Sequence, residues 1–211
     1  ITPYYFSLID FNDSKCPIKA QCIPQILELE EFGELDPMSE STTNPAGAIT
    51  RRYPNKLIIN VTNRCPSYCR HCQRRRLIGQ KDFDTSKEKI DESIQYVRDN
   101  KEIREVLITG GDALTIDNNK LEYIFKSLRD IPHVEILRLG TRTIVTLPQR
   151  INIELAKLLR QYKIFIATQF NHAKEITPEA IKAIDILTDN GIQIRNQMVL
   201  LNGINNNKYV I

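Results

Sequence analysis

From residue 57 onward, two patterns of hydrophobic and polar positions follow each other in turn, short apolar runs and longer amphipathic segments. Five short and nearly continuous apolar runs, rich in Val, Ile and Leu, lie at 57–61, 106–109, 134–139, 164–167 and 192–199. Apolar runs of this length are typical of strands that are buried on both faces of a parallel sheet. The sequence therefore predicts five strands of this kind.

Between these runs, apolar residues recur at the three-to-four-residue spacing of amphipathic helices. The first three stripes are Ile90, Ile94 and Val97; Leu121, Ile124, Phe125 and Leu128; and Leu155, Leu158 and Leu159. The residues from Thr85 to Glu88 resemble a capping box before the first of these helices. A fourth helix is predicted to begin with Thr177 as its N-cap and Pro178 at its first position, and to end at 190–191.

After the first strand, the predicted strands follow one another at intervals of about 29 residues. Such βαβ repeats form a parallel sheet that can curl into a barrel, whose chemistry lies on the loops at the carboxyl ends of the strands. The distinctive segments of this chain, at 62–79, 110–112, 140–142 and 169–172, each follow one of the first four strands. They are therefore expected at the same end of the sheet.

Residues 1–50 have no clear periodicity and contain an acidic run at 28–36 and a stretch rich in Ser, Thr, Asn, Pro and Gly. We interpret 1–50 as an N-terminal wrapping arm and 51–211 as an incomplete barrel core. Cys16 and Cys22 lack companion ligands at short spacing, which favours a structural role. The net charge of +3 does not indicate a polyanion partner, and no apolar run is long enough to span a membrane. Because the chain starts at Ile1 and stops at Ile211, it reads as a fragment that lacks its C-terminal part.

Three cysteines, Cys65, Cys69 and Cys72, follow the first predicted strand at a C-x3-C-x2-C spacing. Three thiolates can hold three irons of a [4Fe-4S] cluster and leave the fourth iron open. A zinc site completed by His71 is an alternative, although adjacent residues rarely ligate one metal. Disulfides are not favoured by an odd count of five cysteines without a secretory signal. Inert burial is the remaining alternative.

Three further segments contain candidate site residues whose roles the residues alone leave open. Gly110 and Gly111 permit a close approach of backbone to a ligand, or simply form a tight turn, and Asp112 contributes to a pocket or caps that turn. Five arginines between Arg64 and Arg76 form either a solvated surface or a carboxylate-binding group. Arg52 and Tyr53, next to Pro54, are suited to a phosphate and a ring, but are also typical of a turn before a strand.

The longer strings YCRHCQRRR, LITGGDAL, IPHVEILRLGTRT, LPQRI, FNHAKEIT and NQMVLLNGINN resemble the amino-acid 2,3-aminomutases, a family of radical S-adenosylmethionine (SAM) enzymes. The resemblance covers nearly the whole chain. Within this family, CQRRR and DPMSESTTNPAGAITRRYP are more similar to glutamate than to lysine 2,3-aminomutases. The resemblance implies an α/β fold, a partial parallel (β/α)6 TIM-like barrel of radical SAM type, here truncated after about the fifth strand.

The resemblance also implies roles for individual residues. Cys65, Cys69 and Cys72 match the ligands of the cluster, and Arg74 matches the arginine that binds the substrate carboxylate. The positions expected beside SAM or pyridoxal 5′-phosphate are His71, Gly110, Gly111, Asp112, Gln169, Gln197, Arg52 and Tyr53. Three residues depart from the family pattern: Gln169 replaces a histidine, Arg195 replaces a glycine, and Lys56 stands where arginine is frequent.

The implied activity is an isomerase reaction, in which the 2-amino group of an α-amino acid migrates to the β position through a 5′-deoxyadenosyl radical. L-Glutamate is the expected substrate. Its cofactors are a [4Fe-4S] cluster, SAM and pyridoxal 5′-phosphate. The Schiff-base lysine is expected downstream of this chain, so we assign no catalytic residue within it and expect the fragment alone to be inactive. A flavodoxin-type or ferredoxin-type electron donor, a cytoplasmic location and a homo-oligomer are expected for the full-length protein.

Three alternatives remain at this stage. Lysine 2,3-aminomutase is the first, because the residues that select the substrate are expected outside this chain. The second is a radical enzyme that lacks pyridoxal phosphate. The third is a zinc-containing nucleic-acid-binding module, although the βα repeats match no recognised module of that class.

Overall fold

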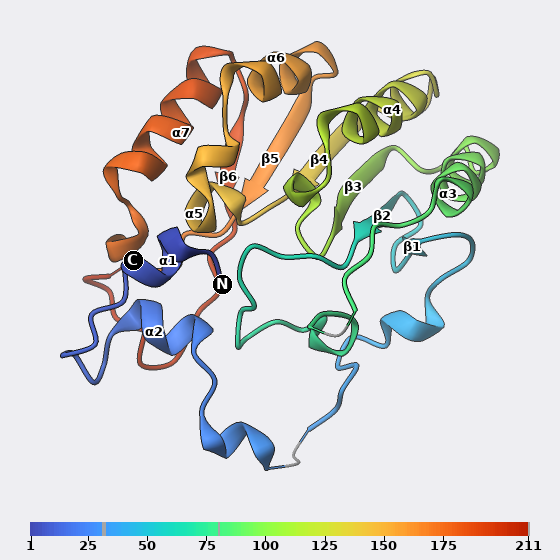
Figure 1. Cartoon of the computed structure of the whole chain (residues 1–211). Helices are drawn as coiled ribbons and strands as arrows, with labels where there is room; N and C mark the ends of the chain where they lie inside the picture. The colour runs from blue at the N-terminus through green and yellow to red at the C-terminus, as the bar shows by residue number, and fades with distance from the viewer. Residues whose placement is uncertain (31–32, 80, 211) are drawn as a thin grey trace.

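The computed structural model describes residues 1–30, 33–79 and 81–210 of the chain. Residues 31–32, 80 and 211 lie outside the described part, and with them a piece of the acidic run 28–36 and the last residue of the predicted barrel segment. The strands form a single open sheet in the order β1 to β6, in which β1 is antiparallel to β2 and every later strand is parallel to its predecessor (Figure 1). The bounds of the strands are β1 Ile49–Thr50, β2 Lys56–Thr62, β3 Glu105–Gly110, β4 Ile136–Gly140, β5 Ile164–Thr168 and β6 Ile194–Asn196.

The parallel strands confirm the five predicted runs, with two differences. The run 192–199 yields only the short strand β6, because the chain leaves the sheet after Asn196 and the backbone N–H of Val199 donates to the side chain of Asn171 instead. The short strand β1 was not predicted, since two residues are too few to establish a period. The open parallel sheet is consistent with a partial barrel, in which β1 and β6 are the edges.

Burial on both faces of the strands was a wrong prediction. Along β2, Leu57 and Ile59 are buried, whereas the intervening Ile58 and Asn60 are partly exposed, and β3 and β4 alternate in the same way. The helices α3 to α7 cover one face of the sheet, and the other face is left open (Figure 1). The residues of each apolar run therefore divide between the core and the open side.

The helices on the covered face agree with the predicted stripes. Their bounds are α3 Lys87–Asp99, α4 Asn118–Arg129, α5 Thr143–Thr146, α6 Ile153–Gln161 and α7 Pro178–Asp189. Thr177 caps α7 and Pro178 begins it, as predicted. At α3 the N-cap is Ser86, while the hydroxyl of Thr85 donates to the carbonyl of Asn60 in β2. The cap therefore starts one residue later than a Thr-x-x-Glu box would place it.

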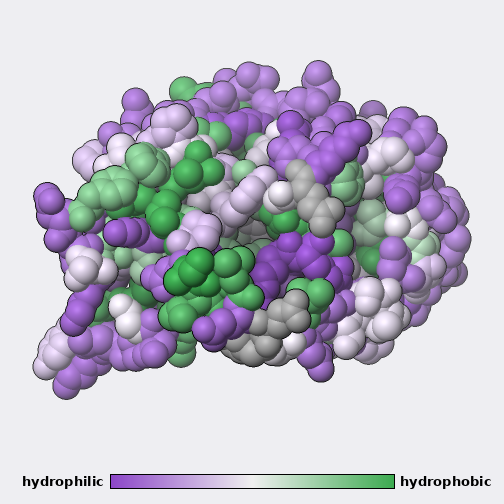
Figure 2. All heavy atoms as spheres, turned by 60° about the horizontal axis from the view of Figure 1, so that its bottom comes forward, coloured by the Kyte–Doolittle hydropathy of each residue, from purple (hydrophilic) through white to green (hydrophobic). Residues whose placement is uncertain are grey.

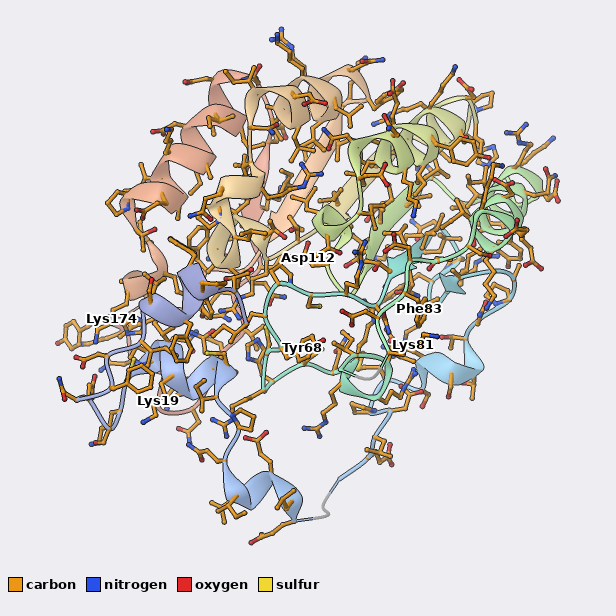
Figure 3. All side chains as sticks on the ribbon, viewed as in Figure 1. Lys19, Tyr68, Lys81, Phe83, Asp112 and Lys174 are labelled. Carbon is orange, nitrogen blue, oxygen red and sulfur yellow. The ribbon has the colours of Figure 1, made fainter. Side chains whose placement is uncertain are left out.

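The N-terminal segment packs against the loops at the carboxyl ends of the strands. Its helices α1 (Pro3–Ser7) and α2 (Pro17–Cys22) contact α5 and the 3₁₀ turn η6 (Ala173–Glu175), respectively. Lys19 on α2 and Lys174 on η6 lie on this side of the molecule (Figure 3). A second apolar cluster fixes the segment there, formed by Tyr5, Ile9, Cys16, Ile18, Cys22 and Val145. Cys16 and Cys22 are free thiols in this cluster, in agreement with the structural role predicted for them. No helix among the described residues has the length and the apolar character that a membrane span requires.

Candidate functional site

A cavity of about 490 Å³ lies at the carboxyl ends of β2 to β5, between these ends and the loop 63–79. Figure 3 shows Asp112 at the end of β3 and Tyr68 within that loop. Figure 2 shows this face of the molecule, where hydrophilic and hydrophobic areas lie side by side. The predicted site residues that line the cavity are Cys65, Cys69, Cys72, His71, Arg74, Gly110, Gly111, Asp112, Gln169 and Gln197. Loops far apart in sequence thus meet at one end of the sheet, as predicted.

The three cysteines of the loop are free thiols, each partly buried. Burial is the main cause that raises the pKa values of the Cys65 and Cys72 thiols above their ordinary value. Deprotonation of these thiols therefore needs a compensating cation, which a bound metal cluster supplies. In the described part of the chain, no three His, Cys, Asp or Glu side chains are arranged to hold a single metal ion. A cubane cluster distributes its protein ligands over several irons, so the three cysteines fit a cluster better than a zinc ion.

Asn63 fixes the shape of this loop. Its amide donates to the carbonyls of Leu77 and Lys81 at 3.2 and 3.0 Å, and its carbonyl oxygen accepts from the N–H of Phe83 at 2.8 Å. The side chain is buried and joins the outgoing and returning arms of the loop. Figure 3 shows Lys81 and Phe83 on the returning arm. No motif predicted this role, and the position of an Asn directly after a strand was its one signal in the sequence.

Gly110 and Gly111 face protein backbone, and this is the physical reason for glycine here. A Cβ on Gly111 would lie 2.3 Å from the carbonyl oxygen of Arg64, and one on Gly110 would lie 2.3 Å from that of Thr62. The backbone N–H of Gly111 donates to Thr62 at 2.6 Å, and that of Asp112 donates to Arg64 at 2.7 Å. The pair therefore holds the start of the cysteine loop against the end of β3. Both glycines also line the cavity, where their backbone is accessible to a ligand. A contact with a ligand stays a prediction.

The carboxylate of Asp112 is fully engaged within the protein. It accepts the N–H of Leu114 at 3.1 Å, the hydroxyl of Thr141 at 2.6 Å and the N–H of Arg142 at 2.7 Å. Burial raises the pKa of this carboxyl group, while the hydrogen bonds act in the opposite direction. The bond from Leu114 supports the capping alternative, and the bonds from Thr141 and Arg142 join the ends of β3 and β4.

Arg74 forms a bidentate ion pair with Glu40. Its Nε and Nη2 donate to the two carboxylate oxygens at 2.8 and 2.7 Å, and both side chains are largely buried. The planar fork of Arg74 therefore already binds a carboxylate, in the geometry expected for an amino-acid ligand. A substrate carboxylate at this position has to share the fork with Glu40 or displace it.

Two other arginines of the loop also pair with acids of the preceding segment. Arg70 binds Glu28 at 2.5 Å, and Arg76 binds Asp36 at 3.1 Å. The arginines of this run were predicted to form a solvated surface or a carboxylate-binding group, and Arg70 and Arg76 bind carboxylates of the protein itself. The arginine run and the acidic run thus stabilise each other.

Arg52 and Tyr53 lie elsewhere. They occupy the turn that precedes β2, at the opposite end of that strand from the cysteine loop, and do not line the cavity. Tyr53 is exposed, and the Nζ of Lys56 lies 4.4 Å from the centre of its ring. A contact of these residues with a cofactor stays a prediction. Arg195, in β6, is exposed and does not line the cavity either.

No role was predicted for Arg142, which follows β4. Its Nη1 donates to the sulfur of Cys69 at 2.9 Å, and its side chain lines the cavity. The segment 140–142 was noted only as a motif after a strand. An arginine directly after a predicted barrel strand was the available signal.

Asp84, on the returning arm of the loop, provides a test of how the loop is anchored. Its carboxylate binds Arg64 at 2.6 Å, Lys120 at 2.8 Å and the hydroxyl of Thr62 at 3.1 Å. Burial alone raises its pKa, but the hydrogen bonds of Lys120 and Thr62 and the charge of Arg64 outweigh burial and lower it. The stabilisation is therefore present above the ordinary pKa of an aspartate and is lost as the pH falls through the lowered value.

We expect Asp84→Asn to reduce the free energy of unfolding at pH 7 by about 1 kcal/mol, because the carboxylate pairs with two cations. The wild type should lose this difference as the pH falls below the ordinary pKa, so the two proteins should converge in acid. Urea unfolding at a series of pH values measures both effects. Asp185→Asn, at an exposed position in α7, is the control, and equal stability of Asp84→Asn and wild type at pH 7 would contradict the prediction.

Comparisons with known proteins show to which proteins this chain is similar. Residues 59–210 match the family model described as the radical SAM superfamily. Glutamate 2,3-aminomutase of Clostridioides difficile (strain 630) is 58% identical over 100% of this chain and 50% of its own length. The L-lysine 2,3-aminomutases of Fusobacterium nucleatum subsp. nucleatum and Clostridium subterminale are 49% and 47% identical, over 97% and 100% of this chain and 49% and 51% of their own lengths. The chain thus spans about half the length of the curated relatives it matches.

Proposed function

Because the chain belongs to the radical SAM superfamily, we propose that it is the cluster-binding and SAM-binding part of a 2,3-aminomutase whose substrate is L-glutamate. The observation that carries the proposal is the set of three free cysteines that line one cavity at the carboxyl ends of parallel strands. When bound, the [4Fe-4S] cluster and SAM supply the one-electron chemistry that starts the reaction. The rest of the proposal concerns what the residues of this chain do.

Cys65, Cys69 and Cys72 are proposed to hold the cluster. The cavity has space for a ligand beside them, and His71, Gln169 and the backbone at 110–111 are proposed to line the SAM site. Gln169 offers an amide to hydrogen-bond with SAM but cannot become cationic as a histidine can. Gln197 lies on the same cavity wall and its backbone N–H donates to Thr168 at 2.7 Å, which anchors it to the end of β5.

Arg74 is proposed to bind the α-carboxylate of the substrate. Its fork already holds the carboxylate of Glu40, and it lines the same cavity as the three cysteines. Glutamate is favoured over lysine as the substrate by the higher identity to the glutamate enzyme, 58% against 49% and 47%. Pyridoxal phosphate is proposed from the similarity to aminomutases alone, with Arg52 and Tyr53 as candidate contacts.

The test uses the complete protein, reconstituted anaerobically with iron and sulfide. We expect an EPR signal of a reduced cubane cluster that changes when SAM is added, and conversion of L-glutamate to its β-isomer in the presence of pyridoxal phosphate. The β-isomer of L-lysine instead would support the lysine alternative. A reconstituted protein that binds zinc and no cluster would overturn the proposal.

Arg74→Ala separates substrate binding from cofactor chemistry. We expect the KM for the amino acid to rise by about 100-fold, as for the loss of a charge-assisted bidentate pair of about 3 kcal/mol. Reductive cleavage of SAM without substrate should continue at a rate similar to that of the wild type. Arg160→Ala, at an exposed position in α6, is the charge-matched control. An unchanged KM would remove Arg74 from the substrate site.

A further inference from the structure

Arg142 is a buried arginine whose backbone is fixed to the neighbouring strand. It is only 8% exposed, and it follows directly after Gly140 and Thr141 at the end of β4. Asp112 accepts both the backbone N–H of Arg142 and the hydroxyl of Thr141. The base of the side chain therefore has little freedom to move.

One side of the Arg142 guanidinium is held by buried partners from three other segments. Its Nη2 lies 2.6 Å from Oε1 of Glu175, 2.6 Å from Oε1 of Gln21 and 3.0 Å from the hydroxyl of Tyr5. Glu175 is fully buried and also accepts the hydroxyl of Tyr5 at 2.6 Å and the amide of Gln21 at 3.0 Å. These partners belong to α1, α2 and η6, so the N-terminal segment takes part in orienting the arginine.

The other side of the guanidinium points to the cysteine loop. Nη1 donates to the sulfur of Cys69 at 2.9 Å, and both side chains line the cavity. The remaining nitrogen, Nε, lies 3.3 Å from the carbonyl of Gln169. With Nη2 held by Glu175 and its neighbours, Nη1 is the nitrogen that presents an N–H group to the sulfur.

We propose that Arg142 is a positioning residue that orients Cys69 and raises the reduction potential of the cluster bound there. The inference rests on the proposed function, because it requires the cluster. Hydrogen bonds to ligand sulfurs and nearby charge set the potential of iron–sulfur clusters, and residues behind the ligands orient them. A cationic donor at the sulfur stabilises the reduced cluster, which carries the more negative charge.

The test is an EPR-monitored redox titration of the reconstituted complete protein and its variants, with iron content measured in parallel. Arg142→Met alone would leave Glu175 buried without its cation, so the double variant Arg142→Met/Glu175→Gln keeps the charges balanced. Arg142→Lys is the conservative variant, which retains the charge without the planar fork. Arg150→Met is the matched control, since Arg150 is a partly buried arginine that binds the carbonyls of Leu114 and Ile116 and does not contact a cysteine.

We expect the midpoint potential of the double variant to shift to more negative values than that of the wild type. In Arg142→Lys this shift should be smaller, and in Arg150→Met it should be absent. A purely structural role would not move the potential of clusters that assemble with full iron content. If Arg142→Lys and the double variant both titrate like the wild type, the inference is wrong while the proposed function stands. If the wild type assembles no cluster, the proposed function fails, and the inference fails with it.

Discussion

Cys69→Ala is expected to abolish the [4Fe-4S] chromophore of the reconstituted protein. Among the residues that the structure describes, three cysteines line the cavity, so the loss of one leaves two protein ligands for four irons. The sulfur of Cys69 also accepts a hydrogen bond from Nη1 of Arg142, so the variant leaves Nη1 without this partner. Absorbance near 400 nm, which is typical of such clusters, and iron content per chain measure the effect.

The matched control is Cys16→Ala. Cys16 is a free cysteine like Cys69, but it is buried in the apolar cluster beneath α1 and α2 and does not line the cavity. We expect Cys16→Ala to lower the free energy of unfolding by about 1 kcal/mol and to leave the iron content unchanged. A full [4Fe-4S] spectrum in Cys69→Ala would refute the ligand assignment, and loss of the cluster in both variants would show that it depends on the packing of the N-terminal segment.

The arrangement of strands and helices could be predicted from the sequence because it depends on local periods. The apolar runs and the stripes on α3, α4 and α6 are visible within windows of a few residues. The rule that parallel strands end at one edge then placed the cysteine loop and the segment 110–112 together. Burial on both faces could not be predicted reliably, because an apolar run does not show which of its faces another element will cover.

The interior of the site depends on contacts that no local pattern shows. Arg74 finds its carboxylate partner 34 positions away, in Glu40, and Arg142 meets Tyr5 137 positions away. A run of arginines and a run of acids were both visible in the sequence, but the sequence did not show which arginine pairs with which acid. The role of Arg142 needed the position of its nitrogen relative to the sulfur of Cys69, which follows only from the packing of four segments.

The two glycines at 110–111 show how a correct motif can have an unexpected physical basis. The sequence left two explanations open, a close approach of backbone to a ligand and a tight turn, whereas the atoms nearest to an added Cβ are those of the backbone that leads into the cysteine loop. Glycine at these positions therefore allows the loop to pack against the end of β3, whether or not the same backbone also contacts a ligand. This distinction can be tested by a single added methyl group.

Gly111→Ala is expected to prevent most of the protein from assembling the cluster. Its Cβ would lie 2.3 Å from the carbonyl oxygen of Arg64, 2.6 Å from the carbonyl carbon of Asn63 and 2.8 Å from that of Arg64. All three are backbone atoms, so no side-chain rotation relieves the clash. The loop has to move just before Cys65, and the hydrogen bond from Asp112 to Arg64 is lost with it. We expect the free energy of unfolding to fall by about 1–3 kcal/mol, as for other overpacked sites.

Gly111 isolates this steric effect better than Gly110 does. Gly110 has a φ of +134°, so a substitution there adds backbone strain to the clash. Gly140→Ala is the matched control, because Gly140 lines the same cavity but its Cβ would meet only side-chain atoms, the oxygen and the Cβ of Thr109 at 3.1 and 3.3 Å, which a shift of a few tenths of an ångström relieves. Iron content after reconstitution and the midpoint of urea unfolding should fall in Gly111→Ala and stay close to wild type in Gly140→Ala. Wild-type values of both quantities in Gly111→Ala would mean that the loop tolerates displacement, and that the pair is needed for contact with a ligand rather than for docking the loop on β3.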